Sequence, residues 1–203
     1  MKNLCRVAIA AAALVTAACQ EDKTDELRTK LKSPEVAARV AAASELGKQR
    51  TASRPAIPEL LAALKDEAWQ VRVAASVALV RIGDKESPPR AALPLAVLAR
   101  DSNAFVRRYA IWALGMMGAG HAALVTAVRD PEPLVREFAA EALKGVAAKA
   151  DAKTLADART ALEALSHDEA RLASGKFTSA VVVKDALAAV EKAATKAAAK
   201  EAR

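Results

Sequence analysis

The chain has 203 residues, of which 53% are hydrophobic and 3% are aromatic, and its net charge is +7. Helix-favouring alanine, leucine, lysine, arginine and glutamate dominate the sequence, whereas only 7 glycines interrupt it. The two cysteines, Cys5 and Cys19, both lie near the N-terminus, which excludes a disulfide framework in the rest of the chain. The composition therefore predicts an all-α fold, long enough to bury a substantial apolar core.

The first 18 residues have the features of an export signal. Lys2 and Arg6 form a positive start, and the apolar run over residues 7–18 is too short to span a bilayer as a permanent helix. Cys19 ends a Thr-Ala-Ala-Cys stretch that resembles the lipobox of bacterial lipoproteins. The resemblance implies that residues 1–18 are a lipoprotein signal peptide and that Cys19 is the site of lipid attachment. The alternative is a soluble export signal in which the cysteine is incidental.

A short polar tether follows over residues 19–26, where most side chains are charged. Gln20, not aspartate, comes directly after the cysteine, and in enteric-type sorting this implies the outer membrane, facing the periplasm. Removal of the leader takes away two basic residues and no acid, so the net charge falls from +7 to +5. The predicted location is the bacterial cell envelope, with the membrane reached through the N-terminal lipid.

An internal repeat occupies the middle of the chain. Four arginines fall in register at spacings of 33, 35 and 29 residues, and each is followed three residues later by alanine and seven residues later by leucine. These arginines are Arg39, Arg72, Arg107 and Arg136. Six residues before them stand Ser33, Asp66, Asp101 and Asp130. Apolar segments with helical spacing lead into the three aspartates, so each unit predicts two helices joined by a turn.

The pattern is similar to the HEAT and HEAT-like (PBS-lyase-type) repeat family, whose units read L-x-x-L-x-D and then V-R-x-x-A-x-x-A-L-G. The resemblance covers residues 33–146 and departs in the first unit, which has Ser33 for aspartate and Ala38 for valine. It implies an α-α superhelix, a HEAT-repeat solenoid of about four to five helical hairpins, with HEAT-like repeats over residues 27–146. It also implies that each aspartate lies in the turn and that an arginine bonds it, so the repeated charges form a structural ladder and not a catalytic site.

The second repeat shows the apolar stripe of a packed helix. Its members are Val71, Ala74, Ala75, Ala78, Leu79 and Ile82. One hairpin cannot bury such a stripe alone, so neighbouring units must stack. Function is then expected on an exposed surface.

The positions outside the stripe predict an apolar patch on the concave face, which repeat solenoids commonly use for partners. In the second repeat they are Val73, Ser76, Val77 and Val80, and in the third they are Arg108, Ile111, Trp112 and Gly115. Trp112 is the expected centre. The candidate partner-binding residues are Val73, Val77, Val80, Arg108, Tyr109, Ile111 and Trp112, since aromatic and arginine side chains dominate interface energetics. The alternative is that they pack between repeats or beneath the C-terminal segment.

Residues 147–203 predict either a degenerate fifth repeat or a helical C-terminal cap with a basic tail. Helices are expected over residues 151–165 and 179–198, with Asp151 and Ser179 as N-caps. Three lysines recur every four residues along one face of the last helix, a row suited to anionic lipid or cell-wall polymer. They are Lys192, Lys196 and Lys200.

Sequence motifs for catalysis, metals or cofactors are missing. His121 and His167 have no second histidine at metal-binding spacing and no cysteine partner other than the lipidated one. No Gly-rich phosphate loop, G-x-S-x-G elbow or paired-carboxylate motif is present. We therefore expect a non-catalytic protein that uses no cofactor and no metal.

Two classes of function remain. The first is a lipid-anchored scaffold that binds an envelope protein or peptide. The second is a HEAT-like lyase-type enzyme or enzyme accessory, for which a polar, acid-bearing pocket on the concave face would be the distinguishing feature. A weaker alternative is an envelope-polymer binder that uses the basic C-terminal helix. Nucleic acid is not an expected partner, because export to a lipid anchor separates the chain from it.

Overall fold

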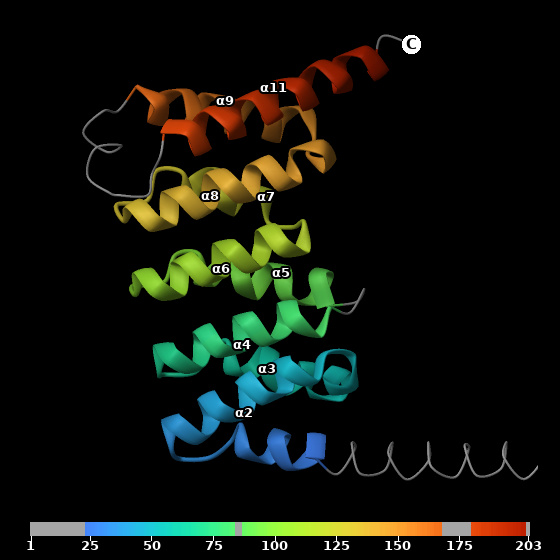
Figure 1. Cartoon of the computed structure of the whole chain (residues 1–203), viewed down its shortest axis with the longest axis vertical. Helices are drawn as coiled ribbons and strands as arrows, with labels where there is room; N and C mark the ends of the chain where they lie inside the picture. The colour runs from blue at the N-terminus through green and yellow to red at the C-terminus, as the bar shows by residue number, and fades with distance from the viewer. Residues whose placement is uncertain (1–22, 84–86, 168–179, 202–203) are drawn as a thin grey trace, which may run out of the picture. The chain divides into compact units, whose positions relative to one another are not determined.

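The computed structural model describes residues 23–83, 87–167 and 180–201, in which every regular element is a helix (Figure 1). The predicted all-α fold class is confirmed. The predicted signal peptide, Cys19 and Ser179 lie outside the described residues. None of the helices in the described ranges is both long and apolar enough to cross a membrane. The chain divides into two compact units, unit 1 (Met1–Asp84) and unit 2 (Lys85–Arg203).

Unit 1 contains two helical hairpins. A helical segment over residues 23–30 is followed by α2 (Val36–Gln49). The short 3-10 helix η1 (Arg50–Ala56) then leads through α3 (Ile57–Ala63) to α4 (Trp69–Ile82). α4 packs against both α2 and α3. Leu46, Leu60 and Leu79, one from each α-helix, are fully buried and form the centre of this core.

Unit 2 contains three hairpins. They are α5 (Ser87–Leu98) with α6 (Ala104–Met117), α7 (His121–Ala127) with α8 (Pro133–Val146), and α9 (Ala152–Ser166) with α11 (Ala180–Glu201). The 3-10 helix η2 (Ala147–Lys149) follows α8. Within this unit α6, α8 and α11 form one layer, which we call the second-helix layer, and α5, α7 and α9 form the other (Figure 1). Because α9 packs on α7 and α11 packs on α8, the C-terminal segment takes the place of a further hairpin.

Small residues set the distance between successive second helices in both units. A Cβ added to Gly47 would lie 3.0 Å from the Ala78 Cα, and one added to Gly115 would lie 2.6 Å from the Ala142 Cβ. Each glycine stands eight residues after a repeat arginine, and each alanine stands six residues after the next one. The same pair of small residues therefore brings α2 onto α4 in unit 1 and α6 onto α8 in unit 2.

Candidate functional site

Arg39 in α2 joins two turns of unit 1. Its Nε and Nη2 donate to the two carboxylate oxygens of Asp66 at 2.8 and 2.9 Å, and its Nη1 donates to the carbonyls of Ser33 and Pro34 at 2.9 and 3.0 Å. Asp66 Oδ1 also accepts a bond from the Ala68 N–H at 2.9 Å. Burial raises the pKa of Asp66, but the bonds from Arg39 and the Ala68 N–H outweigh it, so the net pKa is lowered.

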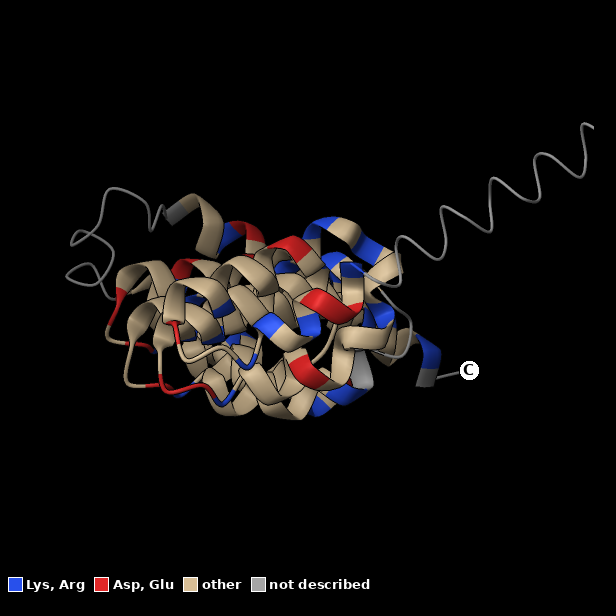
Figure 2. Cartoon of the chain, turned by 90° about the horizontal axis from the view of Figure 1, so that it is seen from below, with Lys and Arg blue, Asp and Glu red and all other residues tan. Residues whose placement is uncertain are grey.

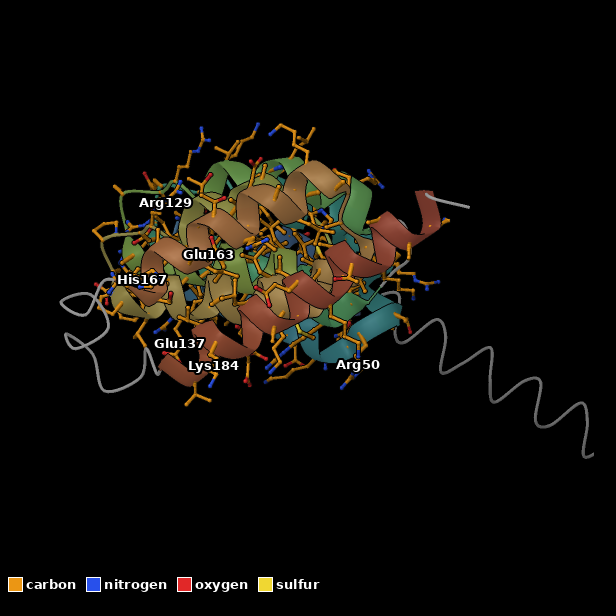
Figure 3. The ribbon with its side chains drawn as sticks, turned by 90° about the horizontal axis from the view of Figure 1, so that it is seen from above. Arg50, Arg129, Glu137, Glu163, His167 and Lys184 are labelled. Carbon is orange, nitrogen blue, oxygen red and sulfur yellow. The ribbon has the colours of Figure 1, made fainter. Side chains whose placement is uncertain are left out.

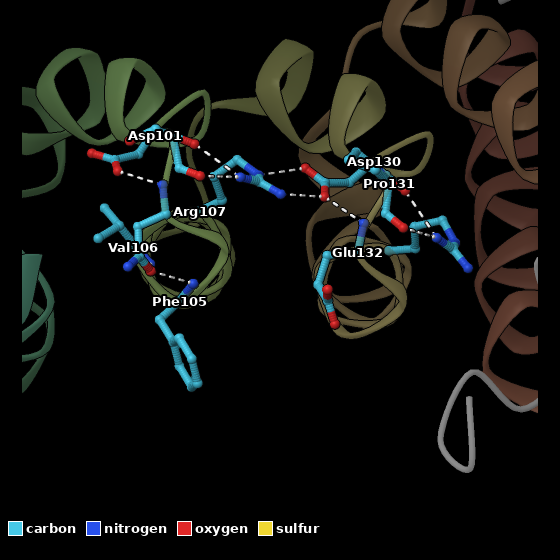
Figure 4. Close-up of polar contacts among 10 residues, drawn as sticks. Asp101, Phe105, Val106, Arg107, Asp130, Pro131 and Glu132 are labelled. Atoms are coloured by element: carbon cyan, nitrogen blue, oxygen red, sulfur yellow. Dashed lines mark hydrogen bonds and ion pairs between the residues drawn. The ribbon is translucent and has the colours of Figure 1, made fainter. Parts of the chain in front are cut away.

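Arg107 in α6 repeats this arrangement in unit 2 (Figure 4). Its Nε and Nη2 donate to both carboxylate oxygens of Asp130 at 2.8 and 2.9 Å. Its Nη1 donates to the carbonyls of Asp101 and Ser102 at 2.9 and 3.2 Å. Asp130 Oδ1 accepts from the Glu132 N–H at 2.9 Å. The hydrogen bond with Asp130 raises the pKa of the Arg107 guanidinium, which therefore stays charged.

Arg72 and Arg136 make the same carbonyl contacts, each within its own unit. Arg72 Nη1 donates to the carbonyls of Asp66 and Glu67 at 2.8 and 2.9 Å. Arg136 Nη1 donates to the carbonyls of Asp130 and Pro131 at 2.9 and 3.0 Å. Figure 2 shows acidic residues on loops that join helices. The predicted bonding between arginine and turn aspartate is therefore confirmed for the pairs Arg39–Asp66 and Arg107–Asp130. In both pairs the guanidinium also bonds backbone carbonyls of a turn.

The predicted outward row is only partly exposed. The half-buried members are Val73, Val77 and Val80 on α4 and Arg108, Tyr109 and Trp112 on α6. Ser76 and Ile111 are fully buried. The prediction that these two side chains face outward is wrong, and Ile111 cannot contact a partner directly.

Both errors fall at the position four residues after the repeat arginine. Ala43 and Ala140 occupy this position in two other repeats and are also 0% exposed. A second helix packs against its own partner and against the second helix of a neighbouring hairpin, as α6 does with α5 and α8. The buried face of each second helix is therefore wider than the single stripe that the sequence pattern reveals.

Arg108 lies among aromatic rings on the second-helix layer. Its guanidinium carbon is 5.0 Å from the ring centroid of Phe105, 5.1 Å from that of Tyr109 and 5.7 Å from that of Phe138. The rings of Tyr109 and Trp112 meet edge to face, with centroids 6.3 Å apart. Arg108 therefore contacts aromatic rings of its own chain, and Tyr109 contacts both Arg108 and Trp112.

A groove of about 480 Å³ opens beside Trp112 among α6, α8 and α11, and we call it the Trp112 groove. Its apolar walls are Trp112 and Met116 of α6, Phe138 of α8 and Val182 of α11. Glu137 and Glu141 of α8 bring two carboxyl groups into the same groove. The arrangement combines aromatic and aliphatic walls with negative charge.

One end of the Trp112 groove is open because a side chain is missing there. Gly145 of α8 lines the groove, and a Cβ added to it would meet no atom within 4 Å. Gly115, on the opposite helix, also lines the groove, but there the missing side chain allows α6 and α8 to approach each other. The two glycines therefore serve different purposes.

The Glu137 carboxyl has a raised pKa. Burial is the larger cause, and the charge of Glu141, one helical turn further along α8, adds to it. The Glu137 Oε2 atom is buried and accepts no hydrogen bond from the described part of the chain. Glu141 lies 3.8 Å from the Nζ of Lys144, which is also 3.5 Å from Asp185. Figure 3 labels Glu137 at the side of unit 2 where α11 begins.

The sequence motifs do not single out Glu137 and Glu141, although a signal for them exists. They stand one and five residues after Arg136, the same positions that Arg108 and Trp112 occupy after Arg107. If the outward-facing positions of the third repeat are applied to the fourth repeat, they fall on Glu137 and Glu141, next to Trp112 in the stack. The two carboxyls therefore line the groove without forming any of those catalytic sequence motifs.

The histidines lie away from this groove. His121 is half-buried at the first position of α7, and His167 is exposed at the end of α9. Within the described ranges, no three His, Cys, Asp or Glu side chains group closely enough to hold a metal ion.

The stacked hairpins, the recurring small-residue contacts and the Asp–Arg bonding define an α-helical repeat protein. A family model described as HEAT repeats matches residues 24–92 and 91–176, and the chain belongs to this family. Among curated proteins no relative matches the chain.

Solved structures share this fold at low sequence identity. An engineered protein matches with a TM-score of 0.68 and 21% identity, over 88% of this chain and 86% of its own. A designed armadillo repeat protein in complex with the peptide (KR)4 matches with a TM-score of 0.64 and 19% identity, over 81% and 80% of the two chains. The complex of CpcE and CpcF of phycocyanin lyase from Nostoc sp. PCC7120 matches with a TM-score of 0.55 and 22% identity, over 82% of this chain and 96% of that one. These likenesses show the fold of a helical repeat solenoid and do not by themselves show a function.

Proposed function

We propose that this protein is a lipid-anchored HEAT-repeat scaffold that binds a protein or peptide in the bacterial envelope and does not catalyse a reaction. The observation that carries the proposal is the Trp112 groove, an open cleft with aromatic walls on the second-helix layer of unit 2. Aromatic side chains in partly desolvated pockets supply most of the binding energy at protein interfaces. The repeat fold is compatible with this use, and a designed armadillo repeat protein of similar fold binds a peptide.

Site-specific photo-crosslinking in envelope preparations tests the scaffold proposal. A photo-crosslinking amino acid at position 112 lies in the groove, whereas one at Ala156, an exposed position on α9, belongs to the other layer. We expect a distinct protein or peptide to be captured from position 112 and not from position 156. Equal capture from both positions, or capture of the chain's own residues from position 112, would contradict a partner site at the groove.

The lipid anchor is a separate part of the proposal and needs its own test. If Cys19 carries the lipid, Cys19→Ala prevents acylation and shifts the protein from the membrane fraction to the soluble fraction. Because one acyl chain alone gives marginal anchoring, the several chains of a bacterial lipoprotein predict stable membrane association of the wild type. A wild-type protein released as freely as the variant would contradict the anchor.

The lyase-type alternative is favoured by one specific feature. Glu137 and Glu141 make the groove acid-bearing, and the raised pKa of Glu137 suits general acid–base catalysis. Intact-mass measurement of the captured partner separates the two functions. A scaffold releases its partner with an unchanged mass, whereas a lyase or its accessory returns a modified one.

A further inference from the structure

We infer that the Trp112 groove recognises a segment bearing lysine or arginine, whose aliphatic stem lies against Trp112 and Phe138 and whose charge meets Glu137 and Glu141. This inference rests on the proposed scaffold function and names the chemistry of its partner. The walls and the carboxyls together carry it, because either feature alone would suit many ligands.

The charge of the groove is opposite to that of the chain. The whole protein has a net charge of +7, yet the side chains that line this groove include two glutamates one helical turn apart on α8. Like charges at this spacing oppose each other, so a cation that contacts both would be stabilising. Lys144 approaches only Glu141, at 3.8 Å, and it also lies 3.5 Å from Asp185. Negative charge is therefore left in the groove for a partner to neutralise.

The position of Glu137 adds to this argument. One of its carboxylate oxygens is buried and accepts no hydrogen bond within the described residues. A buried acceptor without a donor is costly, and a charged donor from a ligand relieves that cost. The raised pKa of Glu137, caused by burial and then by Glu141, agrees with a carboxylate whose charge is poorly compensated. A cation in the groove would compensate that charge.

The apolar walls match the rest of a basic side chain. Lysine and arginine have long aliphatic stems that pack on apolar surfaces while the charged head remains polar. Cations are also attracted to aromatic ring faces. The protein shows this contact within itself, because the Arg108 guanidinium lies 5.7 Å from the ring centroid of Phe138, on the wall of the groove. The volume of about 480 Å³ is in the range of ligand pockets and accommodates a long side chain with its neighbouring backbone.

Tryptophan fluorescence gives a signal located at the groove. Trp112 and Trp69 are the two tryptophans, and Trp69 lies in unit 1 with 38% exposure, so Trp69→Phe leaves Trp112 as the reporter. The probe is an acetylated, amidated octapeptide of alternating lysine and arginine. The neutral control has norleucine for lysine and citrulline for arginine, which keeps the length and most of the apolar surface.

We expect the basic peptide to change Trp112 emission saturably and the neutral peptide to bind at least tenfold more weakly. Glu137→Gln should weaken basic-peptide binding by about tenfold to a hundredfold, since a charge-assisted hydrogen bond is lost. Glu191→Gln, at an exposed position on α11, removes the same charge away from the groove and should leave the affinity unchanged. Added salt should weaken binding to the wild type more than to Glu137→Gln, because screening acts on the charge that the variant lacks.

A second variant tests the groove without altering its charge. Gly145→Leu places a side chain in the open end, where there is space for it, and should block the peptide while the protein stays folded. Equal binding of the basic and neutral peptides, or unchanged binding by Glu137→Gln, would overturn the inference. Capture of a partner from position 112 without binding of the basic peptide would support the scaffold function and reject recognition of a basic segment. If neither capture nor peptide binding is seen, both the scaffold function and the basic partner are rejected.

Discussion

Helix α4 in unit 1 and helix α8 in unit 2 share one framework and present different surfaces. In both, the repeat arginine holds the carbonyls of its own turn, and the residue four positions later is fully buried. One and five positions after the arginine, however, α4 has Val73 and Val77, whereas α8 has Glu137 and Glu141. The framework recurs because every hairpin has to bond the polar backbone groups of its turn and to pack its second helix against neighbouring helices. Specificity is therefore to be sought where equivalent positions differ.

The largest expected effect comes from breaking the shared framework. Asp66→Ala in unit 1 and Asp130→Ala in unit 2 each remove the carboxylate that binds a mostly buried arginine. The aspartate side chains themselves are 12% exposed at Asp66 and 8% exposed at Asp130. We expect each change to lower the free energy of unfolding by about 3 kcal/mol. Similar losses in both units would support a common structural role.

Unit-specific unfolding measures these losses. Urea titration of Asp66→Ala is followed by Trp69 in a Trp112→Phe background, and that of Asp130→Ala by Trp112 in a Trp69→Phe background. Separate reporters are needed because two units need not unfold in one step. A loss below about 0.5 kcal/mol in either unit, the range of ordinary surface substitutions, would contradict the role of the bonds.

The two glycines of the Trp112 groove sharpen the comparison at a smaller scale. Gly115→Ala forces a methyl group to within 2.6 Å of the Ala142 Cβ and should destabilise the protein by about 1–3 kcal/mol. Gly145→Ala adds a methyl group in open space within a helix and should stabilise it by about 0.5 kcal/mol. Thermal unfolding, monitored by circular dichroism, measures the loss of stability in Gly115→Ala and the gain in Gly145→Ala. A stabilising Gly115→Ala would mean that the helices do not approach closely there.

Two carboxyls should respond to pH in opposite directions. The pKa of Asp66 is lowered from 3.8 in the folded protein, so its stabilisation is complete above pH 3.8 and is lost as the pH falls through the folded value. The pKa of Glu137 is raised from 4.5, so its ionisation opposes folding above the folded value and has no effect below pH 4.5. The charged neighbour that adds to the raised pKa of Glu137 is Glu141 on its own helix.

Neutral amide variants measure this difference. Asp66→Asn should lower the melting temperature at pH 7, by less as the pH falls below about 4. Glu137→Gln should raise it at pH 7 by on the order of 1 °C, and the gain should vanish below pH 4.5. A Glu137→Gln variant that is less stable than the wild type at pH 7 would show that the carboxylate already has a donor in the folded chain.

Sequence periodicity predicts the framework well because the same physical demands recur in each repeat. The register of Arg39, Arg72, Arg107 and Arg136 places the second helices correctly, and Asp151 caps α9 through a 2.7 Å bond from the Thr154 N–H. The 3-10 helix η1 is not foreseen, since the left-handed backbone of Arg50, with φ of 53°, has no sequence signature there.

The candidate site is predicted less completely because it depends on contacts between repeats. Trp112 is correctly placed on the accessible side, whereas Ile111 is buried, since the packing of α6 against α8 is not visible in one helix alone. Val182 joins the groove from a distant part of the chain, and no local pattern predicts that. Glu137 and Glu141 escape a search for apolar surface, although the repeat register contains their positions.

The smallest effect on folding is expected from the basic row of α11. Lys192, Lys196 and Lys200 are exposed, so replacing all three by glutamine should leave the melting temperature unchanged within about 1 °C. If this row binds an anionic envelope polymer, the wild type should co-sediment with the polymer at low salt and be released at high salt, whereas the variant should not co-sediment. Identical sedimentation of the two proteins would remove this alternative.

The central claim is that the Trp112 groove is where the partner binds, and blocking the groove tests it most directly. The photo-crosslinking residue at position 112 is combined with Gly145→Leu, or with Ala148→Leu at an exposed position just beyond α8, and capture is compared in envelope preparations. We predict that Gly145→Leu abolishes capture and that Ala148→Leu leaves it intact, with both proteins folded by circular dichroism. Capture that persists with the groove filled would contradict the account.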